Sequence, residues 1–229
     1  MYKITIDGFN GTGKTTLARS LAKSLNFTYV SMGMIFRCIA HEIIENSVSI
    51  AEIDKILQLM ENIDIKLPNN IEKNVYVNNV CVTQAIKDMK YAELCSNISN
   101  NIIIQNGVRD IIRKYAEHNN IIVDGRDTGR LLFPNADVKF ALVADVNTRA
   151  YRRATELGRS VDSDYSDIVE SMKEIDEKLI NANCIPPEDA IVIDSSDLNK
   201  DEIKHDCLKI INEKLPELEI LDLEGEKDL

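Results

Sequence analysis

The chain has 229 residues, enough for one α/β domain with insertions, and its 27 basic and 38 acidic side chains give a formal net charge of −11. This charge argues against a nucleic-acid polymer as a partner, because such binding needs a broad basic surface, whereas a mononucleotide needs only a local cluster of arginines. Five cysteines without C-x-x-C spacing, and no apolar run of membrane-spanning length, indicate a cytoplasmic protein with reduced thiols and no membrane partner.

Short apolar runs alternate with helical patterns along the chain. The apolar runs are mostly rich in Val and Ile, as in parallel strands that helices cover on both faces. The predicted strands are Tyr2–Asp7, Phe27–Val30, Ile121–Asp124, Val138–Val143 and Ala190–Asp194. The predicted helices are Lys14–Leu25, Met34–Glu45, Val108–Glu117, Val146–Leu157 and Lys200–Lys214. This alternation predicts a three-layer α/β fold with a five-stranded parallel sheet.

A glycine-rich segment joins the first predicted strand to the first predicted helix. Its sequence, GFNGTGKTT, fits G-x-x-x-x-G-K-[ST], the phosphate-binding loop (P-loop) of nucleotide-dependent enzymes. The backbone N–H groups of such a loop and the positive end of the following helix dipole attract phosphate. Lys14 would reach the β- and γ-phosphates, and the Thr15 hydroxyl would bind Mg²⁺. The residues expected to bind ATP are Gly8, Phe9, Asn10, Gly11, Thr12, Gly13, Lys14, Thr15 and Thr16.

Two segments interrupt the alternation of strands and helices. The first, about residues 47–105, contains Asn74–Thr83, which predicts a β-hairpin turning at Asn78-Asn79. The second, about residues 157–187, is charged, is predicted to be helical, and occupies a place where phosphoryl-transfer enzymes often have a closing lid. Either segment could instead be a structural addition without ligand contact. We expect one domain over residues 1–215 and an acidic tail over residues 216–229.

A second polar motif follows the predicted strand that ends at Asp124. The sequence continues with Gly125-Arg126-Asp127-Thr128-Gly129, so a carboxylate ends an apolar strand at the edge where ligands bind in open α/β sheets. Asp124 would hold Mg²⁺ through water or orient an acceptor, and Arg126 would bind a phosphate through two parallel hydrogen bonds. A glycine turn with a local Asp–Arg pair would have the same sequence, so this short motif alone leaves both interpretations open.

Together these segments resemble the bacterial cytidylate kinases, a group of nucleoside monophosphate (NMP) kinases. The resemblance runs from Ile4 to about Leu215 and rests on the segments at 6–16, 33–37, 99–102, 107–109, 123–137 and 149–153. It implies ATP- and Mg²⁺-dependent phosphorylation of a cytidine monophosphate-type nucleotide, an NMP-binding insertion at about 47–105, and a lid at about 157–187. We therefore expect a monomer whose partners are small nucleotides.

The resemblance also assigns roles to individual residues. Arg37 and Arg126 would hold the acceptor phosphate, while Ser99, Arg109 and Asp127 would recognise the cytosine edge. The implied catalytic residues are Lys14, Arg126, Arg152 and Arg153, the last two lying near the ATP phosphates. The implied acceptor-binding residues are Met32, Arg37, Ser99, Arg109, Asp124, Arg126 and Asp127, and the implied metal-binding residues are Thr15 and Asp124.

The lid departs from the family pattern R-D-x-x-D-x-x-R. The chain has Ile175, Leu179 and Ala182 at positions that contact the sugar and the transferred phosphate in the family, and Met32 replaces an acceptor-site serine. Another turn of the lid could supply the charge, from Arg159, Lys173 or Lys178. Alternatively, the acceptor could carry a more apolar group in place of the usual ribose, or the protein could bind nucleotides without catalysis.

We favour a working kinase with altered acceptor preference, because the P-loop and the Asp124–Asp127 motif are both complete. A nucleotide-binding regulatory protein is the main alternative. A P-loop kinase of another small phosphorylated metabolite is disfavoured, because such enzymes lack the Asp124–Gly129 motif and the hairpin insertion.

Overall fold

The main sheet contains five strands, as the sequence predicts. Their order is β2 (Thr28–Ser31), β6 (Ile121–Gly125), β1 (Lys3–Asp7), β7 (Val138–Val143) and β8 (Ile191–Asp194). β1 pairs with β7 and β7 pairs with β8 in parallel, with Ile4 opposite Val138 and Phe140 opposite Ile191. The strand order differs from the chain order, since β6 lies between β2 and β1, and β1 lies between β6 and β7. The predicted α/β fold with a five-stranded parallel sheet is therefore confirmed.

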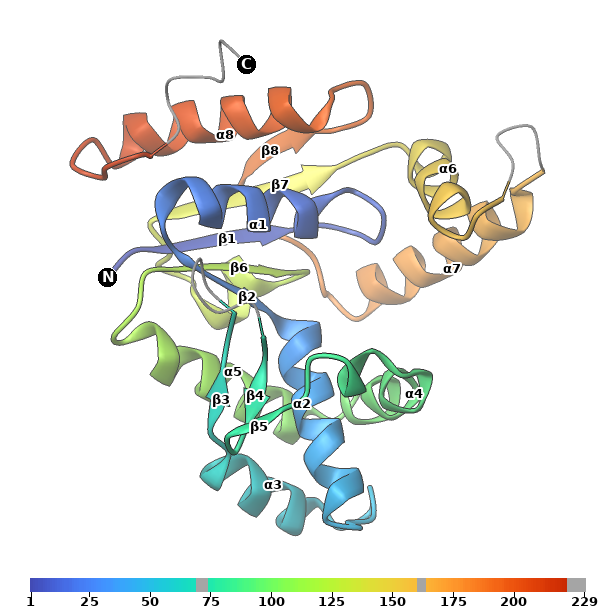
Figure 1. Cartoon of the computed structure of the whole chain (residues 1–229). Helices are drawn as coiled ribbons and strands as arrows, with labels where there is room; N and C mark the ends of the chain where they lie inside the picture. The colour runs from blue at the N-terminus through green and yellow to red at the C-terminus, as the bar shows by residue number, and fades with distance from the viewer. Residues whose placement is uncertain (69–73, 160–163, 222–229) are drawn as a thin grey trace. The chain divides into compact units, whose positions relative to one another are not determined.

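This computed structural model describes residues 1–68, 74–159 and 164–221, and the chain divides into two units (Figure 1). Unit 1 comprises residues 1–2 and 26–121, and unit 2 comprises residues 3–25 and 122–229. Within the described ranges no helix is both long enough and apolar enough to cross a membrane. Of the predicted acidic tail, residues 222–229 lie outside the described part of the chain, and Leu221 before them donates its N–H to the carbonyl of Ser24.

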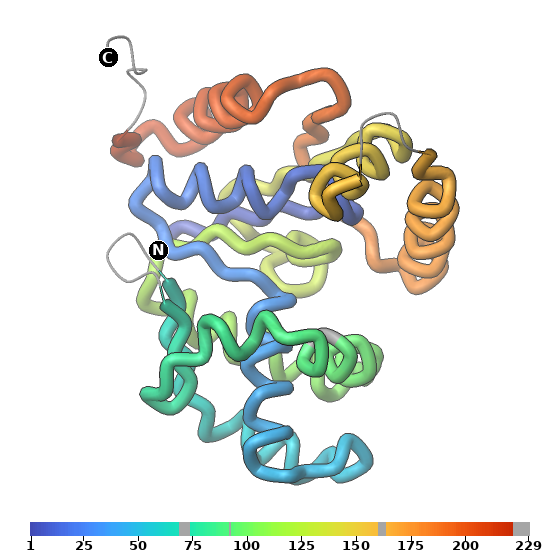
Figure 2. Tube along the Cα trace, turned by 45° about the vertical axis from the view of Figure 1, so that its right-hand side comes forward, coloured from blue at the N-terminus to red at the C-terminus, as the bar shows by residue number. Residues whose placement is uncertain are grey.

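The core of unit 2 lies around β1 and β7, whose apolar side chains are almost entirely buried. Helix α1 (Lys14–Leu25) covers them with a buried apolar stripe that includes Leu17 and Leu21. Helix α8 (Lys200–Lys214) lies beside α1 in both views (Figures 1 and 2). Its first turn has a capping box, in which Asn199 and Glu202 each satisfy the other's backbone N–H. Both helices have the predicted bounds.

The predicted lid segment of unit 2 is helical. Helix α6 (Val146–Glu156) precedes it, and helix α7 (Ser166–Asn181) forms most of it. A separate short turn, η2 (Thr128–Leu132), follows β6. Figure 2 shows α6 and α7 side by side. Their contact is a small apolar cluster that joins alanines of α6 to larger side chains of α7, namely Ala150, Ala154, Ile168 and Met172. Helix α7 is therefore attached to α6 by apolar packing.

Unit 1 contains the predicted hairpin. Strands β4 (Tyr76–Val77) and β5 (Val80–Cys81) pair antiparallel, and Asn78 and Asn79 both have positive φ angles, 49° and 67°, as a type I′ turn requires. Strand β3 (Ile65–Lys66) adds a third strand that the sequence does not predict, since two residues are too few to show alternation. The hairpin packs on α2 through a cluster of small apolar side chains that includes Cys38 and Val77.

The other elements of unit 1 are helical. They are α2 (Met32–Glu45), α3 (Ile53–Asn62), η1 (Ala85–Lys87), α4 (Met89–Ile98) and α5 (Ile102–Ala116). Helix α5 begins earlier than the predicted start at Val108, because the Asn101 side chain accepts hydrogen bonds from the N–H groups of Ile103 and Ile104. Exposed Ile102 and Ile103 interrupt the apolar pattern there, which is why the sequence places the start too late.

Candidate functional site

Three positions of the P-loop of unit 2 require glycine. Gly11 and Gly13 have φ angles of +80° and +92°, in the left-handed region that side chains rarely adopt. A Cβ at Gly8 would lie 2.3 Å from the carbonyl oxygen of Leu142 in β7, so any side chain there would push the loop away from the sheet. The Thr12 hydroxyl donates to the Phe9 carbonyl at 3.0 Å and holds the loop closed. The loop is therefore preformed for close approach of a phosphate.

Two residues with predicted phosphate and metal roles lie at the start of α1. Lys14 Nζ donates to the Phe9 carbonyl at 3.2 Å, and burial lowers the pKa of this ammonium group while the nearby Asp124 carboxylate opposes that shift. The Thr15 hydroxyl donates to Asp124 Oδ2 at 2.5 Å. A hydroxyl and a carboxylate are hard oxygen ligands of the kind Mg²⁺ prefers, usually with waters and substrate phosphates completing its shell. The structure thus brings together both predicted metal ligands.

Asp7, at the end of β1, fixes the turn that follows Asp124. Its Oδ1 accepts from the N–H and the hydroxyl of Thr128, at 2.8 and 2.7 Å, and its Oδ2 accepts from the N–H of Gly129 at 2.8 Å. Burial raises the pKa of Asp7 above the ordinary carboxyl value, although these hydrogen bonds favour the ionised form. The carboxylate therefore ties the turn after Arg126 and Asp127 to the strand that carries the P-loop.

Arg126 reaches the P-loop from the neighbouring strand end. Its Nη2 donates to Asn10 Oδ1 at 3.1 Å, so the guanidinium lies beside the loop that would hold the donor phosphates. Asp127, the next residue, is largely buried and its carboxylate interacts with the Cys184 thiol. The predicted grouping of Lys14, Thr15, Asp124 and Arg126 around one loop is therefore present in unit 2.

Arg149 in α6 is a further contact of the P-loop, and the sequence does not assign it a role. Its guanidinium is almost completely buried, donates to the Asn10 carbonyl at 3.2 Å, and lies 5.7 Å from the centre of the Phe9 ring. It also makes two hydrogen bonds to the Asp176 carboxylate of the lid helix, the shorter at 2.6 Å. Arg149 therefore connects the P-loop to helix α7 within unit 2.

Replacing Asp176 by alanine is expected to lower the free energy of unfolding by about 3 kcal/mol, because it leaves the buried Arg149 guanidinium without its counter-charge. It should also raise the KM for ATP, since Arg149 would no longer be held against the Asn10 carbonyl. Chemical denaturation and initial-rate kinetics measure both effects.

Asp167→Ala is the matched control for Asp176→Ala. Asp167 lies on the same helix as Asp176 and pairs with Arg159, which precedes that helix, but both side chains of this pair are exposed, so its loss should cost less than about 1 kcal/mol. An equal decrease in the free energy of unfolding in the two variants would show that the Arg149–Asp176 pair stabilises the fold no more than an exposed ion pair does.

The other two predicted arginines of α6 differ in environment. Arg152 donates to the carbonyl of the buried Ser195 at 2.6 Å and to the Gly11 carbonyl at 3.5 Å, and the Ser195 hydroxyl donates to the Thr12 carbonyl at 2.9 Å. Arg152 thus belongs to a network that supports the back of the P-loop. Arg153 is exposed and pairs with Glu156 one turn later, so in this structure it does not contact the loop. Its role at the ATP phosphates stays a prediction.

The remaining acceptor residues lie in unit 1. Met32 begins α2, and Arg37, one turn later, donates to the Ile86 carbonyl at 2.9 Å. Ser99 ends α4, and its carbonyl accepts from the Gln105 amide at 2.5 Å. Gln105 in turn accepts from Arg109 at 3.2 Å, so one side chain links Ser99 and Arg109. The structure therefore brings together two of the residues implied to recognise cytosine.

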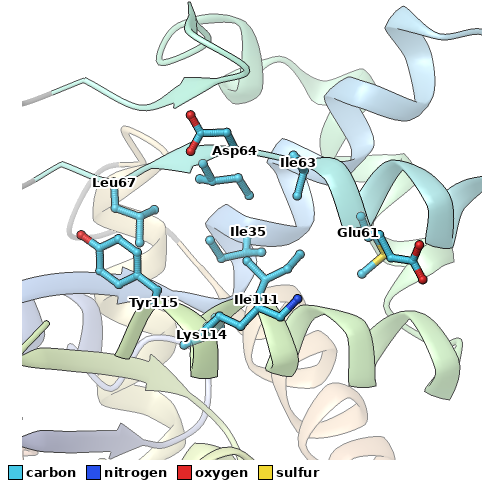
Figure 3. Close-up of a pocket in the computed structure, with 11 residues that line it drawn as sticks. Ile35, Glu61, Ile63, Asp64, Leu67, Ile111, Lys114 and Tyr115 are labelled. Atoms are coloured by element: carbon cyan, nitrogen blue, oxygen red, sulfur yellow. The ribbon is translucent and has the colours of Figure 1, made fainter. Parts of the chain in front are cut away.

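Unit 1 also contains a cavity of about 180 Å³ (Figure 3). Its wall is mainly apolar, and Figure 3 shows the carboxylates of Glu61 and Asp64 pointing away from Ile35 and Ile111. The lining residues are Ile35, Met60, Glu61, Ile63, Asp64, Ile65, Leu67, Ile111, Ile112, Lys114 and Tyr115. They include none of the residues implied to bind the acceptor, so we assign this cavity no part in the acceptor site.

The altered lid positions lie along one side of α7 and its end. Ile175 and Leu179, four residues apart, are half-buried, whereas Ala182 caps the helix and is exposed. Of the charges that could compensate from another turn, Arg159 makes two hydrogen bonds of 2.8 Å to Asp167, and Lys173 and Lys178 are exposed. None of these three side chains has a hydrogen bond to the P-loop in the described part of the chain.

Sequence reasoning missed Asp7, Arg149, Asp176 and Ser195 as supporting residues. Each acts through a partner distant in sequence, such as Asp7 with Thr128. A usable signal existed for Asp7, an acidic residue that ends an otherwise apolar strand directly before the P-loop. No comparable signal existed for Arg149, because in the sequence it is one of three arginines in the same helix, with Arg152 and Arg153.

Comparisons with known proteins show the family of the chain. A sequence model of the cytidylate kinase family matches residues 4–213. Cytidylate kinase of Fusobacterium nucleatum subsp. nucleatum is 32% identical, with the match covering 87% of this chain and 92% of that protein. Cytidylate kinase of Carboxydothermus hydrogenoformans is 33% identical, with coverage of 93% and 98%. A solved structure of an uncharacterized protein from Eubacterium ventriosum aligns with a TM-score of 0.53 at 16% identity, covering 93% of this chain and 99% of that one, which indicates the fold alone.

Proposed function

Since the chain belongs to the cytidylate kinase family of nucleoside monophosphate kinases, we propose that it transfers the γ-phosphate of ATP to a cytidine monophosphate-type nucleotide. The observation that carries this proposal is the grouping of Lys14, Arg126 and the Thr15–Asp124 pair around one preformed P-loop. Phosphoryl transfer depends mainly on positioning and charge stabilisation, and this grouping offers two cations and a metal-binding pair at one place.

The donor side follows from the P-loop. The loop N–H groups and the N-terminus of α1 would bind the ATP phosphates, with Lys14 moving from the Phe9 carbonyl to the β- and γ-phosphates. Thr15 and Asp124 would hold Mg²⁺, whose positive charge would offset the negative charge of the donor phosphates. Arg149 and Arg152 would keep the loop in shape, since both donate to its carbonyl oxygens.

The acceptor side rests on the family pattern. Arg126 and Arg37 would hold the acceptor phosphate, and Ser99, Arg109 and Asp127 would recognise cytosine. An oxygen of the acceptor monophosphate forms the new bond to the γ-phosphorus as the bond to the ADP oxygen breaks. That oxygen is already ionised near neutral pH, because the second pKa of a phosphate monoester is about 6, so no general base is needed.

The acceptor preference is expected to differ from that of relatives with the full lid pattern. Ile175 and Leu179 offer apolar, half-buried side chains where the family has an arginine and an aspartate. A ribose hydroxyl would lose its hydrogen-bond partners there, whereas a sugar with a more apolar substituent would lose less. We therefore include sugar-modified cytidylates among the candidate acceptors.

A nucleotide-binding protein without catalysis is the second candidate. The observation that favours it is the same loss of lid charges at Ile175, Leu179 and Ala182. The intact Lys14–Thr15–Asp124 grouping favours the enzyme instead. A protein that only binds a nucleotide does not need two Mg²⁺-binding residues and a lysine placed for phosphate transfer.

A coupled ADP-release assay over CMP, dCMP, UMP and sugar-modified cytidylates tests the proposal. We expect turnover with at least one cytidylate and none with UMP. Thermal unfolding with Mg²⁺-ATP supplies the control, because ligand binding to the folded state raises Tm. A Tm increase with ATP but no turnover with any cytidylate would favour the non-catalytic candidate.

A further inference from the structure

Arg130 lies at the end of the lid helix, although it comes from the η2 turn of unit 2. Its Nη2 donates to the carbonyl of Asn183, the residue directly after Ala182. Ala182 is the C-cap of α7, and Asn183 donates its N–H back to the Ile180 carbonyl at 2.9 Å. The guanidinium is therefore anchored at the position along the lid where the family pattern ends in an arginine.

The surroundings of Arg130 connect it to the implied acceptor residues. Its Nη2 lies 4.0 Å from Asp127 Oδ2, and the Asp127 carboxylate also interacts with the thiol of Cys184 in the same lid turn. Arg126, implied to hold the acceptor phosphate, lies close enough to the Cys184 thiol to lower its pKa, although burial raises that pKa overall to about 11. Arg130 thus shares one cluster with two residues implied to contact the acceptor.

The hydrogen-bonding capacity of Arg130 is only partly used. A guanidinium has five N–H donors, and the Asn183 carbonyl takes one of them. The Nε atom is buried and has no hydrogen-bond partner among the residues that the structure describes. A ligand cannot reach the buried Nε itself, but the Arg130 side chain is 31% exposed, so its remaining Nη donors are accessible to an anionic ligand.

We infer that Arg130 contacts the acceptor phosphate and supplies the positive charge that the family has at position 182. This inference rests on the proposed function. The methyl group of Ala182 is exposed, so a larger side chain could occupy this position. The family places a cation here with an arginine at position 182, whereas this chain places one with Arg130, which bonds to the neighbouring Asn183. The three cationic side chains considered from the sequence are less suitable for binding the acceptor phosphate. Arg159 is paired with Asp167, and Lys173 and Lys178 are exposed.

The test compares wild-type protein, Arg130→Ala, Arg130→Lys and the double variant Arg130→Ala/Ala182→Arg. We expect Arg130→Ala to lower kcat/KM for the best cytidylate by roughly 10²–10³-fold without changing the KM for ATP. Arg130→Lys should be intermediate, because an ammonium keeps the charge but not the fork of donors. Ala182→Arg in the Arg130→Ala background should recover part of the loss, which a merely structural role of Arg130 cannot explain.

Arg159→Ala is the matched control, since Arg159 also pairs with the lid helix but through an exposed contact. Unchanged kcat/KM in Arg130→Ala, or a larger loss in Arg159→Ala, would overturn the inference. Calorimetry that compares the affinities of CMP and cytidine tests the role of Arg130 independently of the proposed kinase activity. If wild-type protein binds CMP more tightly than cytidine but forms no diphosphate, the proposed function fails, and the inference stands only if Arg130→Ala removes that preference for CMP. If wild-type protein does not distinguish the two ligands, the inference is wrong.

Discussion

Replacing Lys14 by alanine is expected to lower kcat by roughly 10³-fold or more while leaving the fold intact. Lys14 is the only cation of the P-loop itself, and its Nζ is held at the loop by the Phe9 carbonyl. In the proposed reaction this ammonium group would offset charge on the β- and γ-phosphates as the bond between them breaks. Alanine keeps the helix start but removes that charge, so ATP binding should weaken less than turnover.

Lys23→Ala is the matched control for Lys14→Ala. Lys23 lies in the last turn of the same helix and is exposed, so its loss tests the effect of removing a lysine from α1 away from the site. Initial rates and Tm should be measured for both variants. Similar turnover in the two variants would mean that Lys14 has no part in catalysis.

Arg126→Ala is expected to lower kcat by roughly 10³–10⁵-fold, the range seen when a transition-state arginine is removed in other phosphoryl transfers. Its guanidinium is held beside the P-loop by the hydrogen bond to Asn10. Two further N–H groups of the guanidinium are available to bind phosphate. Arg126→Lys should recover only a small part of the rate, because an ammonium cannot make the same two parallel hydrogen bonds.

Arg113→Ala provides the control for Arg126→Ala. Arg113 is an exposed arginine of α5 that pairs with Asp110 one turn away, so its loss should leave the kinetics unchanged. If Arg126→Ala retained the wild-type kcat with a cytidylate acceptor, the assignment of Arg126 to the transferred or acceptor phosphate would be wrong.

The five strands of the sheet and the strand–loop–helix unit around the P-loop could be predicted from the sequence because both depend on local patterns. Val138–Val143 is an apolar strand that is buried up to Leu142, and Lys14–Leu25 has its apolar stripe directly after the P-loop. Glycine and lysine spacing in that loop follows from contacts within one strand–loop–helix unit. These features therefore need no information from distant parts of the chain.

The supporting contacts could not be predicted in the same way. The pairing of Arg149 with Asp176 and that of Asp7 with Thr128 depend on the folded arrangement of separate elements. The sequence indicates that the lid lacks two arginines and an aspartate, but not that Arg130 ends beside Asn183, because that contact joins segments far apart in the chain.

Product analysis tests the central claim most directly. Wild-type protein incubated with ATP, Mg²⁺ and a panel of cytidylates should form ADP and one cytidine diphosphate-type product in equal amounts, separated by anion-exchange chromatography, and Lys14→Ala should form neither. ADP without an equal amount of nucleoside diphosphate, or no product in a wild-type sample that binds ATP, would contradict the assignment of this chain as a working cytidylate kinase.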